Sequence, residues 1–432
     1  SGHVNLTMVA LPPLILLLGD EVLVRQRRRP WVAGGLLGLV ALAQLLTTEE
    51  ILASTFVMAI LGVAVLLWQH RRHLDAERMH RARVGLGVAV AVLTVGGAWP
   101  LSVQFLSSDA VHDPVQNLSS YAADVFGAVV PSAFQLLGTS ATSGWGGNAS
   151  ENGSYLGIPL LAGLAFLAWR YRREGVVRFA AALGVVAWVL SLGERLHIAG
   201  SSYDVPLPFA AVLHIPVLNS LAAVRFSLYV VLCACLVLAV GLDRLHASGA
   251  FDRQVNRRRA AVAVVLCAAP LLPKVPYSYV EARTPAYFTS SAVERIPSGA
   301  VALTYPLARF PNSAPMDWQA QSHFRYRTLG GYVITTKEHG KGTFTGGQSI
   351  WEVVAGQAAG APSPTVATQV QRRLLQEMTE LHVRAVLVAD GPGATGVNQL
   401  VSILLGRGPD EHVGGVSAWY IANGPAAGPL PG

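Results

Sequence analysis

Apolar runs that alternate with arginine-rich turns are the feature that most constrains this chain. A helix of roughly 20 apolar residues crosses the hydrocarbon layer of a membrane, and residues 1–273 contain a series of runs near that length. Only 13% of the 432 residues are charged, whereas a soluble domain carries about 25%. The sequence therefore predicts a multi-pass membrane protein of about eight transmembrane helices. The predicted spans lie near residues 4–24, 31–47, 51–68, 84–106, 156–171, 178–193, 226–244 and 260–273.

Arginine clusters occupy every second connection between these runs. They lie at residues 25–29, 71–83, 170–178 and 244–259. Cytoplasmic loops of membrane proteins carry an excess of Lys and Arg, so these turns are predicted to face the cytoplasm. Both chain ends, the turn at residues 47–50 and everything after Pro273 are then predicted on the outer side. Because this placement accounts for the net charge of +7, the charge does not predict a nucleic-acid partner.

The chain begins at Ser1, just before the first apolar run, which suggests a fragment that lacks its N-terminal part. Its three cysteines, Cys233, Cys235 and Cys267, all lie within apolar runs. This placement predicts neither a disulfide nor a thiolate metal site.

The composition becomes that of a soluble domain after residue 273, so the chain divides into a membrane region, 1–273, and an extracytoplasmic domain, 274–432. Alternating strand and helix patterns predict a small α/β domain there. The expected strands are 299–307, 383–390 and 417–421, and the expected helices are 365–382 and 397–406. Residues 117–138 are moderately apolar and are expected to form an amphipathic helix at the membrane interface.

Two adjacent carboxylates, Glu49 and Glu50, lie in the outward turn between the second and third spans. In one interpretation Thr47 and Glu50 form a capping box, in which Thr and Glu side chains satisfy the free N–H groups at a helix start. In the other, a carboxylate at the outer membrane face serves as a catalytic base or holds a ligand. The residues leave both alternatives open.

Two basic side chains are candidates for binding a lipid-linked phosphate. His3 lies at the outer end of the first span, where it either caps the helix or donates to an anion. Arg225 begins the seventh span after a proline-punctuated apolar segment. It either extends toward lipid headgroups or holds a phosphate, whose geometry a guanidinium matches with two hydrogen bonds.

The segment 316–332 of the outer domain is rich in aromatic and polar side chains. Its aromatic rings either pack in the core or stack on a sugar. The predicted acceptor-binding residues are Asp317, Trp318, Gln319, His323 and Tyr332. The glycine pattern of residues 391–396 matches a dinucleotide fingerprint, but it is interpreted as a plain strand–turn–helix connection because no acidic residue ends a second strand at the required distance.

Several of these segments together resemble the C-terminal part of actinobacterial membrane glycosyltransferases of the GT-C type. They are GHVNLT, the outward Glu-Glu turn, LPFAAVLHIPVLNSLAAVRFS, IPSGAVALTYPL and WQAQSHFRYRTLGGY. The resemblance implies transfer of a sugar from a polyprenyl-phosphate donor to a glycan or glycolipid of the cell envelope, on the outer face. It implies that Arg225 is the basic residue near the donor phosphate, and that Glu49 and Glu50 correspond to acids of a later outer loop. The usual catalytic acid of the family would precede this chain.

The favoured prediction is therefore an enzyme that transfers a hexosyl or pentosyl group, with a divalent metal ion as a candidate cofactor. One alternative is a lipid or glycan transporter or flippase, which usually has charged or broken helices at mid-membrane and internal repeats. Ionisable residues are nearly absent from the middle of the predicted spans, which argues against that class. The other alternative is a membrane assembly protein without catalytic activity.

Overall fold

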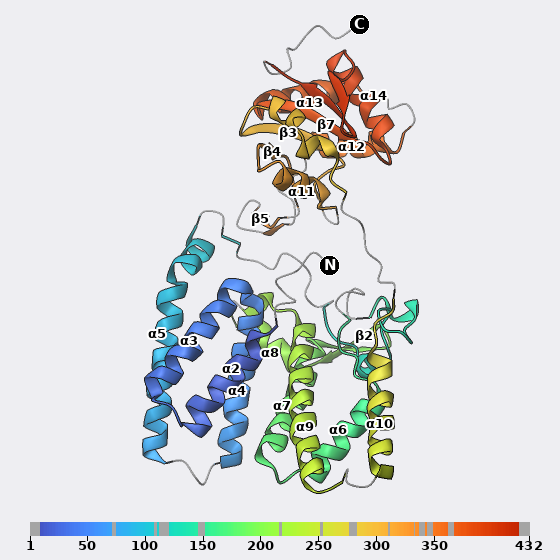
Figure 1. The fold of residues 1–432 in the computed structure, drawn as a ribbon. Coiled ribbons are helices and arrows are strands. Elements are labelled where there is room, and N and C mark those ends of the chain that lie inside the picture. The colour runs from blue at the N-terminus through green and yellow to red at the C-terminus, as the bar shows by residue number, and fades with distance from the viewer. Residues whose placement is uncertain are drawn as a thin grey trace. The chain divides into compact units, whose positions relative to one another are not determined.

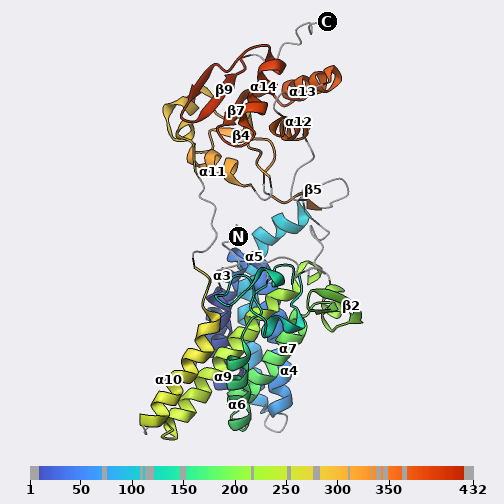
Figure 2. The same ribbon diagram turned by 90° about the vertical axis from the view of Figure 1, so that its right-hand side faces the viewer.

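The structure is a computed structural model of the 432-residue chain. It describes residues 9–70, 75–107, 110–111, 121–145, 152–215, 218–250, 254–275, 283–309, 312–331, 333–336, 342–343, 349–361 and 367–422. The chain divides into two compact units (Figures 1 and 2). Unit 1 comprises Ser1–Ser107 and Gln116–Ser278, and unit 2 comprises Ser108–Val115 and Tyr279–Gly432.

Unit 1 is a bundle of helices (Figure 1). Its main elements are α2 (Leu11–Asp20), η1 (Glu21–Arg25), α3 (Pro30–Thr47), α4 (Glu49–His70), α5 (Ala76–Leu106), α6 (Ile158–Arg170), α7 (Gly175–Ser191), α8 (Phe209–Leu213), η7 (Ala223–Phe226), α9 (Ser227–Ala247) and α10 (Gln254–Ala268).

Four segments among the described residues are long and apolar enough to cross a membrane. They are Pro30–Thr47, Glu49–Gln69, Ala76–Leu106 and Ala223–Ala247. In an 18-residue apolar window of each segment, only 17% to 39% of the residues are buried inside the chain, which leaves apolar surface for lipid to cover. The chain is therefore a membrane protein, but eight spans are not confirmed. Helix α6, for example, has only 13 residues, and α7 has 17.

Helices α3 and α5 approach each other through glycine. A Cβ atom added at Gly34 would lie 2.1 Å from the carbonyl oxygen of Gly85, and one added at Gly38 would lie 2.7 Å from that of Ala89. Small residues allow such backbone contact between membrane helices, where packing replaces the hydrophobic effect as the source of association. The two helices are thus in contact at positions where only glycine fits.

A second helical core joins α4, α6, α7 and α9. Phe226 is fully buried in it, and the Tyr229 hydroxyl lies 2.8 Å from both Ser54 Oγ and Thr55 Oγ1 of α4. Hydrogen bonds of this kind link helices within a membrane. They fix the start of α9 against the start of α4.

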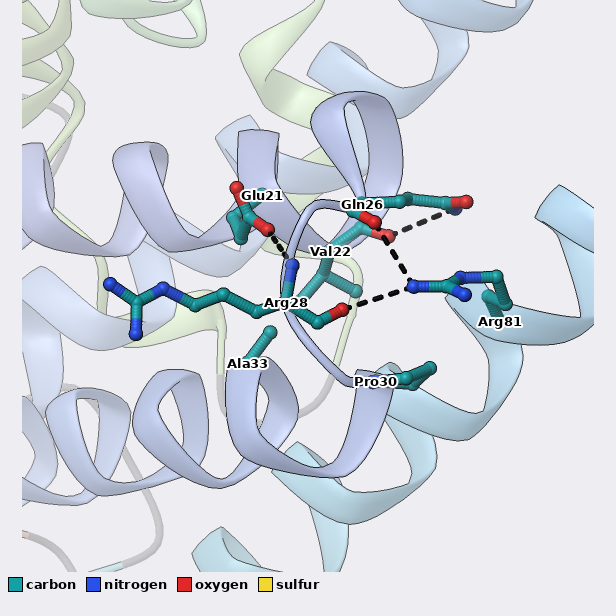
Figure 3. Close-up of a pocket in the computed structure, with 7 residues that line it drawn as sticks. All are labelled: Glu21, Val22, Gln26, Arg28, Pro30, Ala33 and Arg81. Atoms are coloured by element: carbon teal, nitrogen blue, oxygen red, sulfur yellow. Dashed lines mark hydrogen bonds between the residues drawn. The ribbon is translucent and has the colours of Figure 1, made fainter.

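The arginine-rich turn between α2 and α3 is tied to α5 (Figure 3). Arg81 donates to the carbonyl oxygens of Gln26, at 3.0 Å, and Arg28, at 3.1 Å. The Arg28 backbone N–H donates to Glu21 Oε1 at 2.6 Å. The cavity that these residues surround measures about 10 Å³, room for about one water molecule, so this turn is a structural tie and not a ligand pocket.

The expected interfacial helix over residues 117–138 is wrong for the described residues, 121–138. They contain one short 3-10 turn, η3 (Val125–Ala128), within irregular backbone. The Asp124 carboxylate caps this turn by accepting from the Phe126 N–H at 2.9 Å, and Pro131 follows shortly after. Proline removes a backbone donor and limits helix growth. A hairpin of β1 (Arg195–Ile198) and β2 (Ser201–Pro206) completes this end of unit 1.

Unit 2 contains a five-stranded sheet in the order β4-β3-β7-β9-β8. The strands are β3 (Ala300–Tyr305), β4 (Tyr326–Thr328), β7 (Val383–Ala389), β8 (Glu411–Val413) and β9 (Val416–Tyr420); a separate pair is β5 (Thr335–Thr336) and β6 (Gly342–Thr343). β3 pairs in parallel with β4 and β7, whereas β9 is antiparallel to both β7 and β8. The three strands predicted from the sequence are confirmed as β3, β7 and β9.

Helices cover both faces of this sheet. On one face lie α12 (Ile350–Ala359), α13 (Thr368–Glu380) and α14 (Ala394–Leu405), and on the other lie η9 (Ala286–Thr289), η10 (Ser291–Arg295) and α11 (Ala314–Gln321). Side chains of β7 alternate between the two cores, because successive residues of a strand point to opposite faces. Residues 391–393 form the turn from β7 into α14, as the plain strand–turn–helix interpretation predicts.

We expect Gly34→Ala to lower the free energy of unfolding by about 1–3 kcal/mol, the usual cost of overpacking a close contact. The added methyl group would meet the Gly85 backbone, which has no side-chain freedom with which to move away. Gly35→Ala is the matched control in the same helix, because nothing lies within 4 Å of its added Cβ. Thermal unfolding of the full chain in detergent compares the two variants. Equal stability of both would contradict the α3–α5 contact.

Candidate functional site

The candidate site begins at the turn between α3 and α4. Thr48 lies between the two helices, where its N–H donates to the Gln44 carbonyl oxygen and its carbonyl oxygen accepts from the Leu52 N–H. This turn lies at the same end of unit 1 as the start of α9, and the arginine-rich turns α2–α3 and α6–α7 lie at the other end (Figure 1). The two carboxylates therefore lie at the end of the bundle opposite these turns.

Glu50 forms an ion pair with Arg225. Its Oε1 accepts from Arg225 Nε at 3.2 Å and from the backbone N–H of Ala222 at 3.3 Å. The side chains of Arg225 and Glu50 are 19% and 26% exposed. The pair is thus partly shielded from water, which strengthens the attraction relative to an exposed surface pair.

Arg225 is oriented by the buried turn on which it lies. Its neighbours Val224 and Phe226 are both buried, and the Phe226 ring packs edge-on against Phe209 with ring centroids 5.8 Å apart. The Val224 N–H donates to the Tyr121 carbonyl oxygen at 3.0 Å. Because the turn is anchored on both sides of Arg225, the guanidinium is directed toward α4.

Glu49 has a different partner. Glu49 is exposed, and its Oε2 accepts a hydrogen bond from Gln104 Nε2 of α5 at 2.5 Å. The two adjacent carboxylates therefore contact different elements, Glu49 the end of α5 and Glu50 the turn η7 and the residue before it. Glu49 is the more accessible of the two to a molecule from solvent.

The capping-box interpretation of Glu50 is wrong. The Glu50 carboxylate lies on Arg225 and Ala222, and the Thr47 hydroxyl donates to the Ala43 carbonyl oxygen at 2.7 Å. The fully buried Gln44 instead supports the turn by donating to the Thr48 carbonyl oxygen. A local four-residue pattern could not reveal this, because the stronger partner of Glu50 lies 175 residues away.

Of the other predicted site residues, His3 and Tyr332 lie outside the described residues. Trp318 is 4% exposed, its ring stacks on Phe288 and its N–H donates to the Arg283 carbonyl oxygen, a placement that corresponds to the core alternative. Asp317 accepts from Thr284, and Gln319 donates to the Tyr326 carbonyl oxygen. His323 is exposed. Trp318, Asp317 and Gln319 thus have partners within unit 2, whereas the His323 side chain is exposed to solvent.

Two partners in the candidate site are not among the residues predicted from the sequence. Gln104 is a polar residue in the last turn of a long apolar helix, and that isolation is a signal that could have identified it. The Ala222 N–H is a backbone group, and no sequence pattern distinguishes it. Both donate to the carboxylates of the Glu-Glu turn.

Unit 2 holds a buried carboxylate, Glu352 of α12, at 7% exposure. Burial raises the pKa of its carboxyl group, an effect that Arg309 partly offsets. A Cβ atom added at Gly330 would lie 2.7 Å from Glu352 Oε1, so the carboxyl group is packed against the backbone after β4. Within the described ranges, no group of three His, Cys, Asp or Glu side chains could hold a metal ion.

The comparisons with known proteins found a likeness among solved structures. No family model matches the chain, and no curated protein matches it. A cryo-EM structure of the arabinofuranosyltransferase AftD from Mycobacteria aligns with 90% of this chain and 26% of its own length, at 15% sequence identity and a TM-score of 0.37. The chain thus spans about a quarter of that protein. A likeness of this size establishes no shared activity.

We expect a double-mutant cycle on Glu50→Gln and Arg225→Gln to show coupling of about 0.5–3 kcal/mol in unfolding free energy, the range for residues in direct contact. The control cycle uses Glu174 and Arg244, whose Nε–Oε1 distance of 3.1 Å is similar but whose side chains are 38% and 49% exposed. Exposed pairs contribute at most about 1 kcal/mol. Additive single effects at Glu50 and Arg225 would show that the ion pair does not form.

Proposed function

We propose that this chain acts as a membrane glycosyltransferase that moves a sugar from a polyprenyl-phosphate donor to a cell-envelope acceptor. The observation that carries the proposal is the Glu50–Arg225 pair, which holds a guanidinium at the end of the helices opposite the arginine-rich turns. If those turns face the cytoplasm, as their charge favours, transfer takes place on the outer face. The resemblance of the sequence to GT-C enzymes supports the same reaction class.

Arg225 binds the donor phosphate in this proposal. Guanidinium groups match phosphate oxygens with two parallel hydrogen bonds, and a helix end at the membrane surface is the depth at which a lipid phosphate lies. When no donor is bound, the Glu50 carboxylate forms an ion pair with the Arg225 guanidinium. The phosphate replaces the carboxylate, so that the charge of Arg225 is balanced by an anion in both states.

Glu49 is the proposed general base. Its exposed carboxylate is oriented by Gln104. It takes the proton of the acceptor hydroxyl while the acceptor oxygen attacks the anomeric carbon of the sugar. The bond from that carbon to the phosphate oxygen breaks, and its electron pair leaves with the phosphate, whose added charge Arg225 stabilises. No step in this scheme passes through a metal ion.

Two further assignments extend this proposal. His3 is a second phosphate contact, proposed from the sequence. Unit 2 binds the acceptor glycan, and the exposed His323 is the residue of its predicted patch best placed to contact a ligand from solvent.

We expect Arg225→Ala to reduce sugar transfer per unit of donor concentration, kcat/KM, by roughly tenfold or more. Hydrogen bonds to charged groups contribute about 1.5–3 kcal/mol, and 1.4 kcal/mol corresponds to about tenfold. The measurement follows label from polyprenyl-phosphate pentoses and hexoses into envelope glycolipid, with the full chain in proteoliposomes. Arg244→Ala is the matched control, because it removes an arginine of similar pairing geometry from the opposite end of α9.

The same assay separates the alternative functions. Movement of the labelled lipid between leaflets without any transfer would indicate a flippase. Absence of both activities in the wild-type chain would indicate an assembly protein. Equal transfer by Arg225→Ala and Arg244→Ala would remove Arg225 from the site.

A further inference from the structure

The β1–β2 hairpin is a small sheet that lies beside the helices of unit 1. β1 begins four residues after α7 ends, and among the described residues the hairpin has no third strand. Figures 1 and 2 show it projecting sideways from the end of the bundle at which α7 ends. All six residues of β2 are exposed. Some of these exposed residues are apolar.

The two faces of the hairpin differ in character. Residues opposite each other in an antiparallel pair point to the same face, and successive residues alternate. The pairing of Leu196 with Tyr203 and of Ile198 with Ser201 therefore gathers these apolar side chains on one face. The register shifts between Arg195 and Leu196, so Val205 has no paired residue, but it follows Tyr203 by two residues and lies on the same face by alternation. The other face carries His197, which pairs with Ser202, and Asp204, which forms an ion pair with Arg195. The hairpin is amphipathic.

The hairpin is held at its turn and at its base. At the turn, the Gly200 N–H donates to Asp124 Oδ2 at 2.8 Å, and the buried Asp124 is fixed in turn by the cap of η3. At the base, the Leu207 N–H donates to the Glu194 carbonyl oxygen at 2.9 Å, and Phe209 is 2% exposed in the core that contains α9. The apolar face is thus carried by an element that is anchored to the rest of unit 1.

We propose that the apolar face of the β1–β2 hairpin lies in the membrane interface and contacts lipid. The hairpin lies at one end of a helical bundle that is embedded in a membrane. Lipid can therefore cover its apolar face, and no partner protein is needed. Apolar side chains of interfacial elements enter the headgroup and acyl boundary to about 5–10 Å, and tyrosine favours that layer because its ring is apolar and its hydroxyl is polar. Tyr203 and Val205 are 48% and 47% exposed, while Arg195 and Asp204 remain in water.

A lipid surface fits better than an added peptide strand. An extended peptide would pair with the free edge of β2 through main-chain hydrogen bonds. That edge ends at Pro206, which has no N–H, and carries the charged Asp204 beside it. Proline and charge on an edge strand discourage such pairing.

Spin labels on alternate residues of β2 test the proposal. Single cysteines replace Ser202, Tyr203, Asp204 or Val205 in a full chain in which Cys235 and Cys267 are changed to Ala; the buried Cys233 stays. Each protein is placed in nanodiscs of phosphatidylcholine and phosphatidylglycerol. Collision rates are then measured with oxygen, which concentrates in lipid, and with a water-soluble nickel chelate.

We expect the ratio of oxygen to nickel collisions to be several-fold higher at positions 203 and 205 than at 202 and 204. Ser202→Cys is the closest control, since it is adjacent to Tyr203 and nearly isosteric. High nickel collision rates at all four positions would overturn the proposal in favour of a solvated hairpin. Low collision rates with both reagents at 203 and 205 would also overturn it, because they would place protein, not lipid, against this face. Neither readout depends on transferase activity.

Discussion

The ion pair between Glu50 and Arg225 is the interaction on which this end of unit 1 depends. It joins the first turn of α4 to the turn before α9, and the Ala222 N–H adds a backbone donor to the same carboxylate oxygen. Beneath it, the hydroxyls of Ser54, Thr55 and Tyr229 link the same two helices. A partly shielded charge is costly without an opposite charge nearby, so Glu50 stabilises the arginine at this position.

This pairing connects the structure to the proposed function. In that proposal Glu50 holds the guanidinium of Arg225 until the donor phosphate replaces it, and the anchored turn around Phe226 limits the movement of Arg225. The hairpin that follows α7 joins the same core through Phe209, which packs on Phe226. A lipid-facing hairpin and a phosphate-binding arginine would thus be two parts of one surface that receives a polyprenyl-linked substrate.

Much of the architecture could be predicted because hydrophobic pattern determines it locally. The runs at 31–47 and 84–106 correspond to α3 and α5, and alternating residues of β7 fill two cores as its sequence indicates. The failures have a common cause in distant contacts. Residues 121–138 do not form a helix because Asp124 caps η3 and binds Gly200, which is 76 residues away. The sequence predicts Glu50 and Arg225 each as candidate site residues, but only the fold shows that the two side chains pair.

The central claim is that Glu50 and the donor phosphate compete for Arg225. The most direct test is the affinity of the full chain, in detergent micelles, for a polyprenyl phosphate without sugar. Glu50→Gln should bind this lipid about tenfold more tightly than the wild type, because a charge-assisted hydrogen bond of about 1.5–3 kcal/mol no longer opposes binding; Glu49→Gln should bind it as the wild type does. Unchanged or weaker binding by Glu50→Gln would contradict the claim.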